Sequence, residues 1–266
     1  NLIVPYYSQN RDFSYTCEDL MDYYEGSDIK ALLLVNPDNP SGNFIIKSEI
    51  LRLSEWAGQK DIRLIVDESF MDFADTSDSQ TLLSEAILQE NRHLTVIKSI
   101  SKSFGVPGLR LGIAASADED LITYLKKDIA IWNINSIAEF YLQICEKYSD
   151  DYRSALEKFK YVRAEFIEKL RSVPNLRLIP TQANFVMCEV LDGFSSENLS
   201  KILLYDHNIL IKDLSANKGI DGQFIRVAIK TREENNQLIA ALHNIFGKTS
   251  RTKASNYRLS SRKVFI

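Results

Sequence analysis

The first candidate for chemistry is a lysine among small hydroxyl residues. Lys102 follows an apolar run at residues 94–98. A lysine amine held away from water is the group that forms a Schiff base with a carbonyl. Ser99, Ser101 and Arg110 would offer a phosphate beside that carbonyl neutral hydrogen-bond donors and one forked cation. A lone lysine is more often a solvated surface charge, so the hypothesis needs support from other residues.

Two further polar residues also follow predicted strands. Asn39 lies in a turn after the apolar run 31–35, and Asp67 directly follows the run 63–66. Parallel sheets bind ligands at the carboxyl ends of their strands. We therefore expect Asn39, Asp67 and Lys102 at one edge of a sheet. Asn39 on its own has a plain alternative, because Asn and Pro are ordinary turn formers.

The order of the elements predicts an α/β fold. Short apolar runs predict buried strands at 31–35, 63–66, 94–98 and 111–115. Helical spacing between them predicts helices at 47–60 and 82–90. This alternation indicates a mostly parallel sheet with helices on both faces.

The second half of the chain predicts a long helix and a small α+β domain. Residues 136–171 have helical periodicity throughout. Strands are predicted at 176–179, 184–190, 209–211 and 224–229, with helices at 196–205 and 232–246. The division we predict is a large domain at 1–135, a connecting helix and small domain at 136–247, and a basic tail at 248–266.

Composition favours small-molecule chemistry over nucleic-acid binding. The 266 residues carry a formal net charge of −4, and no basic stripe recurs at helical spacing. The cysteines and histidines are scattered, which is typical of reduced thiols and gives no metal-ligand spacing. No apolar run reaches the roughly 20 residues of a membrane span, and no signal peptide is recognisable. We expect a cytoplasmic protein without a metal, a nucleic-acid partner or a membrane partner.

The two ends of the sequence carry expectations of their own. Residues 248–266 contain basic and no acidic residues, which predicts a solvated tail, with a partner-binding or membrane-surface segment as the alternative. The chain begins at Asn1 in a segment unlike a natural beginning. That start predicts the later part of a longer polypeptide.

Three separated motifs together resemble one enzyme family. The string S-x-S-K-x-F-x-x-x-G-x-R-x-G at residues 99–112 is similar to the lysine segment of fold-type I pyridoxal-phosphate enzymes, the class I/II aminotransferases. It follows N-P-x-N-P-x-G at 36–42 and D-E-S-F at 67–70 in the family's order. Within the family, the chain most resembles histidinol-phosphate aminotransferases and threonine-phosphate decarboxylases. The resemblance covers residues 1–247 and implies the type I transferase fold with pyridoxal 5′-phosphate as cofactor.

The resemblance implies a role for each residue of the motifs. Lys102 would hold the cofactor as a Schiff base and move the substrate Cα proton as general base. Asp67 would pair with the protonated pyridine nitrogen, so that the ring accepts electrons, and Asn39 would donate to the ring oxygen. The cofactor phosphate would be anchored by the donors of the lysine segment, namely Ser99, Ser101 and Arg110.

Two residues are implicated in substrate binding. Arg226 interrupts the apolar strand 224–229 and resembles the family arginine that binds the substrate α-carboxylate through two parallel hydrogen bonds. Its alternative is an outward-facing residue of a half-buried strand. Asn133 matches a family segment near the substrate, and capping a helix is an equally weighted alternative for it.

The chain departs from the family pattern in two places. Phe70 stands where the aminotransferases of this group usually have Tyr, and it cannot donate a hydrogen bond to the ring oxygen. About thirty residues precede the Asn39 motif, whereas in the family well over a hundred do, including a phosphate loop and an aromatic that stacks on the cofactor. The large domain is therefore expected to be incomplete in this chain.

The expected activity is amino-group transfer between a small amino acid or amino phosphate and a 2-oxo acid. Phe70 keeps a second activity open, decarboxylation of a phosphorylated hydroxy-amino acid. A third possibility is a non-catalytic fragment of a fusion protein, favoured by the missing front segment and the basic tail. Because family members usually dimerise, the resemblance implies a homodimer.

Overall fold

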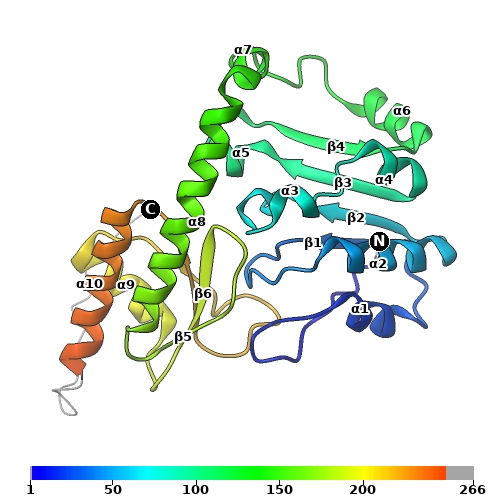
Figure 1. Ribbon diagram of the computed structural model, residues 1–266. Helices are drawn as coiled ribbons and strands as arrows, with labels where there is room; N and C mark the ends of the chain where they lie inside the picture. Colours follow the sequence, from blue (N-terminus) through cyan, green and yellow to red (C-terminus); the bar gives the residue numbers. More distant parts are fainter. Residues whose placement is uncertain (1, 250–266) are drawn as a thin grey trace.

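A long helix joins two β-sheets in the computed structural model, which describes residues 2–249 (Figure 1). Residues 250–266 of the predicted basic tail lie outside the described part. The first sheet is built from residues 31–116 and the second from residues 176–228. The predicted division into domains after residue 135 stays a prediction.

The first sheet has four strands in the order β1-β2-β3-β4. They are β1 (Ala31–Val35), β2 (Arg63–Asp67), β3 (Leu94–Ser99) and β4 (Gly112–Ser116). The first three are parallel, and β4 runs antiparallel to β3. The predicted strands are therefore confirmed to within a residue or so at their ends, and the mostly parallel sheet is confirmed with them.

Helices pack on one face of this sheet. The core there combines β1–β3 with α1 (Cys17–Tyr24), α2 (Lys47–Gln59) and α4 (Glu85–Glu90). In α2, Ile50, Leu53 and Ala57 are fully buried, as their spacing predicts. On the opposite face Leu33 is 60% exposed. Within residues 2–249 the helices thus cover one face of the sheet, not both as expected.

Short elements follow the carboxyl ends of the strands. A 3-10 turn, η1 (Met71–Phe73), and α3 (Ser77–Gln80) come after β2. The one-turn helix α5 (Ile100–Ser103) and η2 (Pro107–Leu109) come between β3 and β4. The helix α6 (Glu119–Asp128) follows β4.

The connection between the sheets is two helices and not the single helix predicted over 136–171. The structure has α7 (Ser136–Ile144), a 3-10 turn η3 (Cys145–Tyr148) and the long α8 (Ser149–Arg171). Figure 1 shows α7 at the upper end of α8. The helical spacing of apolar residues continues through the turn, so periodicity alone does not reveal the break.

The second sheet is antiparallel, in the order β5-β6-β8-β7. Its strands are β5 (Leu176–Leu178), β6 (Phe185–Val190), β7 (Lys212–Asp213) and β8 (Phe224–Ala228). Together with α8, the helices α9 (Ser196–His207) and α10 (Arg232–Thr249) enclose its core. This confirms the small α+β unit, although β7 begins just after the predicted run 209–211.

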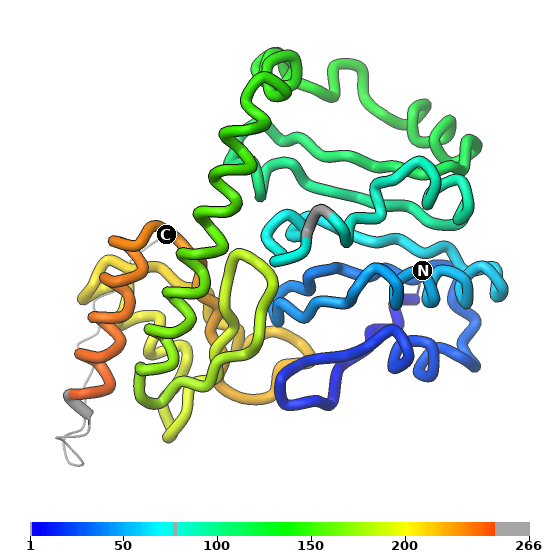
Figure 2. The backbone as a smooth tube through the Cα atoms, in the orientation of Figure 1, coloured from blue at the N-terminus to red at the C-terminus, as the bar shows by residue number. Residues whose placement is uncertain are grey.

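The beginning of the chain lies against the second sheet. Figure 2 shows the first loop beside the loop between β7 and β8. Phe13 packs edge-on against Phe224 at 5.1 Å between ring centroids. Arg177 of β5 donates to the carboxylate of Asp12 and, at 2.9 Å, to the carbonyl of Arg11. These contacts fix residues 10–13 to the second sheet.

Candidate functional site

The carboxyl ends of the parallel strands meet at one edge of the first sheet. The Asn36 amide donates to the Asp67 carbonyl at 2.9 Å. The Ser69 amide donates to Asp67 Oδ1 at 2.8 Å, and Ser69 Oγ accepts the Ser99 amide at 2.9 Å. Asp67 and Ser99 are thus joined through Ser69 at this edge, as the parallel sheet predicts.

The turn after β1 is fixed by its own side chains and by the second half of the molecule. Asn36 is buried, and its amide exchanges two hydrogen bonds with the backbone of Ile45. Asp38 accepts from the amide and the hydroxyl of Ser41. Gly42 has a φ of +81°, and a Cβ at that position would lie 2.9 Å from Thr181 Cα. Glycine is therefore required where this turn meets residue 181.

Arg226 reaches across from the second sheet to this turn. Its Nη1 donates to Asn39 Oδ1. Its guanidinium lies over the Phe185 ring at 4.9 Å from the centroid, within the range of a cation–π contact. Burial lowers the pKa of Arg226. The structure thus brings Asn39 and Arg226 together, although they are 187 residues apart in sequence.

Phe70 packs against the Phe185 ring that lies under Arg226. It is buried and contacts the Phe185 ring edge-to-face at 5.3 Å. Phe70 and Phe185 belong to the small core between the two sheets. Phe70, which stands in place of Tyr, is therefore an apolar ring in contact with the ring that supports Arg226.

Lys102 lies in the one-turn helix α5 directly after β3. Its residue is exposed, whereas the neighbouring Ser101 is buried. The Ser101 hydroxyl has no hydrogen-bond partner among the described residues. Such an orphaned hydroxyl is a donor available to a ligand.

Arg110 lies near α5 at the start of β4. Its backbone is left-handed, with φ 59°, and its Nη1 donates to the Pro107 carbonyl at 3.1 Å. The Ile100 amide donates to the next carbonyl, that of Leu111, at 3.2 Å. This bond holds the Arg110 segment beside the residues that flank Lys102.

Asn133 is not brought to this edge by any hydrogen bond within residues 2–249. It is exposed, and its backbone amide donates to the Ala130 carbonyl. The helix cap belongs to Asn135, whose side chain accepts from the Ala138 amide at 2.9 Å. The capping role predicted as an alternative for Asn133 is therefore wrong, because Asn135, two residues later, caps α7.

Sequence reasoning missed one residue beside Arg226. Lys212 of β7 is the register partner of Arg226 in β8, so both side chains stand on the same face of the second sheet. Lys212 is exposed, and no ion pair joins it to another described residue. The predicted strand stopped at 211, so the pairing that brings Lys212 next to Arg226 was not recognised.

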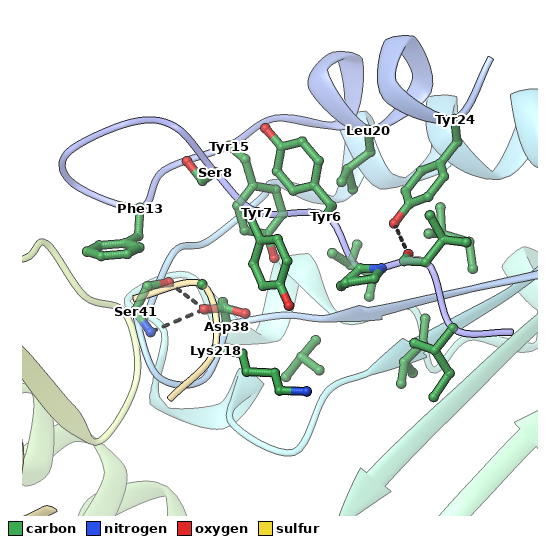
Figure 3. Close-up of a pocket in the computed structure, with 18 of the residues that line it drawn as sticks. Tyr6, Tyr7, Ser8, Phe13, Tyr15, Leu20, Tyr24, Asp38, Ser41 and Lys218 are labelled. Atoms are coloured by element: carbon green, nitrogen blue, oxygen red, sulfur yellow. Dashed lines mark hydrogen bonds between the residues drawn. The ribbon is translucent and has the colours of Figure 1, made fainter. Parts of the chain in front are cut away.

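A cavity of about 900 Å³ lies beside the Asn39 turn. The first residues, β1 and the loop 217–220 line it. Figure 3 shows the Lys218 side chain ending in this cavity, with Tyr7 and Asp38 close by. Asn39 and Pro40 also line the cavity, so it adjoins the candidate site.

Comparison with known proteins identifies the family. Residues 2–242 match the family model described as aminotransferase class I and II. The chain belongs to the class I and II aminotransferase family. The resemblance inferred from the three motifs is thereby confirmed.

The relatives include both decarboxylases and aminotransferases. L-serine phosphate decarboxylase of Campylobacter jejuni is 32% identical over 250 residues, covering 91% of this chain and 63% of its own length. Threonine-phosphate decarboxylase of Salmonella typhimurium is 29% identical, covering 82% and 58%. The crystal structure of histidinol-phosphate aminotransferase from Clostridium acetobutylicum superposes with a TM-score of 0.81 at 27% identity, covering 90% and 70%. The chain thus spans about 63% of the length of the first of these relatives.

The family's cofactor is pyridoxal 5′-phosphate, and the residues at the strand edge fit it. The Ser101 hydroxyl, the Asn39 amide nitrogen and Asp67 Oδ2 have no hydrogen-bond partner among the described residues. Ser101 could donate a hydrogen bond to a phosphate, and Asn39 could donate one to a ring oxygen. Asp67 could accept one from a protonated ring nitrogen. Ser99 and Arg110 would add donors for the cofactor phosphate, and Lys102 would supply the amine.

One structural test concerns membranes. Among the helices of the described residues, none is both long and apolar enough to cross a bilayer.

Proposed function

We propose that the protein is a pyridoxal-phosphate-dependent decarboxylase of a phosphorylated hydroxy-amino acid. The observation that carries the proposal is the pair of adjacent cations, Arg226 and Lys212, on one face of the second sheet. Like charges directly opposite each other in a sheet destabilise it, so such a pair suits a ligand with two anionic groups. An amino-acid phosphate has a carboxylate and a phosphate.

The relatives favour the same substrate class. Two of them are decarboxylases of serine phosphate and threonine phosphate by name. The D-E-S-F string with Phe70 also resembles the threonine-phosphate decarboxylases. We therefore propose decarboxylation in place of the amino-group transfer expected from the sequence.

The roles of the residues follow from their chemistry. Arg226 would bind the α-carboxylate through its guanidinium fork, and Lys212 would bind the phosphate as a point charge. When bound, pyridoxal phosphate supplies a ring that takes up the electron pair left on Cα after a bond to Cα breaks. In a decarboxylation the bond from Cα to the carboxylate breaks, carbon dioxide leaves, and a proton is returned to Cα. We assign that proton transfer to Lys102 Nζ.

Amino-group transfer is the second candidate. It is favoured by the fold similarity to histidinol-phosphate aminotransferase, whose TM-score of 0.81 extends over 90% of this chain. In that reaction the Cα–H bond breaks instead, and the product is a 2-oxo acid.

The experiment supplies the full-length protein and pyridoxal phosphate with O-phospho-L-serine or O-phospho-L-threonine, with and without a 2-oxo acid. We expect carbon dioxide and an amino-alcohol phosphate, independent of the 2-oxo acid. Formation of a phosphorylated 2-oxo acid that depends on the added acceptor would establish amino-group transfer. If neither substrate is turned over, the proposed activity is contradicted and a non-catalytic fragment of a fusion protein is favoured.

The proposal includes a homodimer, and an exposed apolar segment supports it. Ile131 and Trp132 are 86% and 92% exposed, and Ile137 and Phe140 in α7 are exposed as well. Several large apolar side chains exposed within ten residues of sequence are typical of a segment that contacts another protein. Light scattering after gel filtration should give twice the chain mass, and Trp132→Ser should weaken the association.

A further inference from the structure

A cluster of buried polar side chains lies behind the Lys102 segment. Lys98 Nζ donates to Asp72 Oδ1 at 2.5 Å, with side chains 14% and 16% exposed. Lys98 alternates with Ser99 along β3, so it lies on the opposite face of the sheet from Ser99. The ion pair therefore lies behind the strand edge that carries the candidate cofactor groups.

Tyr152 of α8 joins this cluster to α5. Its ring stacks face-to-face on Phe104, with centroids 4.0 Å apart and planes within 3°. Phe104 is the residue that ends α5, and its amide donates to the Ile100 carbonyl. The ring of Tyr152 thus packs against the residue that ends the one-turn helix carrying Lys102.

The hydroxyl of Tyr152 faces polar groups on two other elements. Burial raises the pKa of Tyr152, the charge of Asp72 raises it further, and Ser103 opposes that rise. The phenol therefore stays protonated and is a donor at neutral pH. We call Asp72, Lys98, Ser103 and Tyr152 the Tyr152 cluster.

The cluster holds polar atoms that are not yet satisfied. Asp72 Oδ2, Ser103 Oγ and the Tyr152 hydroxyl are buried and have no hydrogen-bond partner among the described residues. Buried polar atoms are ordinarily hydrogen-bonded, so these three atoms are exceptions.

From this arrangement we infer that Tyr152 is a positioning residue for the amine of Lys102. Its ring stacks on Phe104 at the end of α5, so the orientation of α5 depends on this contact. The inference rests on the proposed role of Lys102 in holding the cofactor. It does not depend on whether the reaction is a decarboxylation or an amino-group transfer.

The test compares Tyr152→Leu, which removes the stacked ring, with Tyr161→Leu. Tyr161 lies on the same helix and is 71% exposed, so it is a matched control. In the full-length protein with pyridoxal phosphate, two quantities are measured: the rate at which borohydride traps the cofactor on Lys102, and the pH midpoint of the bound cofactor's visible absorbance. Melting temperature is recorded for each variant.

We expect Tyr152→Leu to trap the cofactor roughly two- to tenfold more slowly, the effect of one lost aromatic stack, and to shift the absorbance midpoint. Phe104→Leu removes the other ring of the stack and should shift the midpoint in the same direction, which covers a Tyr152 variant that fails to fold. Tyr161→Leu should match the wild type. A wild-type midpoint in both the Tyr152 and the Phe104 variant would overturn the inference while leaving Lys102 in place. No trapping on wild-type Lys102 would overturn the assigned role of Lys102 itself, and the inference with it.

Discussion

Arg226 is a half-buried cation whose contacts are not acidic. Its guanidinium bonds to the Asn39 amide oxygen and lies over the Phe185 ring, and no ion pair joins it to another described residue. A partly desolvated cation without an anion is costly to bury. The arrangement leaves the forked donors of Arg226 available to a carboxylate.

The first prediction separates the two cations by substrate. Lys212→Met should raise KM for O-phospho-L-serine roughly tenfold or more, since a hydrogen bond to a charged group contributes about 1.5–3 kcal/mol. Arg226→Met should impair every amino-acid substrate, phosphorylated or not. Steady-state kinetics with phosphorylated and unphosphorylated serine measures the difference.

The control for that experiment is Lys218→Met. Lys218 is exposed and lines the neighbouring cavity, so its removal changes net charge equally. An equal rise of KM in the Lys212 and Lys218 variants would mean that general electrostatic attraction, and not a phosphate contact, is responsible.

The second prediction concerns the cofactor lysine. Borohydride reduction after incubation with pyridoxal phosphate should add one cofactor mass to the chain, and Lys102→Ala should abolish it. Lys158→Ala, an exposed position on α8, should keep it. Intact mass followed by peptide mapping measures both, and an adduct that survives in Lys102→Ala would place the reactive amine elsewhere.

Individual residues were predictable from sequence where a motif and a strand end coincide. Asn39, Asp67 and Ser99 follow strands whose apolar runs are unmistakable, and parallel pairing then puts them at one edge. Lys212 was missed because its relation to Arg226 is a cross-strand pairing, which a linear sequence does not display. Asn133 was linked to a cap that its neighbour Asn135 forms, because both are Asn residues before the same helix.

Among the helices and strands, the long and buried elements were the ones that the sequence predicted well. The strands β1, β2 and β3 are continuous apolar runs, and the structure reproduces them within a residue or so. β7 has two residues, too few to give a periodic signal. The break at η3 was missed because apolar spacing survives a short 3-10 turn.

The third prediction concerns the end of β2. Glu68 is fully buried and accepts from Thr81 Oγ1 and the Leu82 amide, each at 2.6 Å. Burial raises the pKa of Glu68 above its ordinary value of 4.5. The folded state then holds this proton more tightly than the unfolded state does, so Glu68 contributes stability at low pH that is lost as pH rises through the folded pKa.

Glu68→Gln should therefore flatten the pH dependence of the free energy of unfolding. The variant loses about 1 kcal/mol at low pH, because the amide nitrogen of Gln cannot accept one of the two hydrogen bonds. That deficit should narrow as pH rises. Urea denaturation at several pH values between about 5 and 8 measures the gap, and a deficit that widens with pH would contradict the assigned pKa direction.

At the scale of the whole molecule, one buried arginine ties the two sheets together. Arg163 of α8 has a side chain that is 4% exposed. Its Nη1 donates to the carbonyls of Phe73, Gln182 and Ala183 at 2.6, 3.1 and 3.3 Å, and its Nη2 donates to Asp75 at 2.5 Å. Phe73 and Asp75 lie after β2 of the first sheet, whereas Gln182 and Ala183 precede β6 of the second.

This junction also supports the candidate site. Ala183 and Phe185 share a small core with Phe70, and Phe185 is the ring under Arg226. The Gln182 amide donates to the Gly42 carbonyl at 3.1 Å, in the turn that carries Asn39. Arg163 therefore holds the segment through which the second sheet meets the Asn39 turn.

The fourth prediction follows from that position. Arg163→Met keeps the length of the side chain but leaves several carbonyl groups at the junction without a donor, so the free energy of unfolding should fall by about 3 kcal/mol or more. Arg153→Met on the same helix is the control, since Arg153 is 70% exposed in its pair with Asp150 and exposed pairs contribute about 0–1 kcal/mol. Urea denaturation followed by circular dichroism measures both variants. Equal small losses would show that the junction is held by its apolar core instead, because Phe70, Phe73 and Phe185 would then suffice to keep the two sheets together.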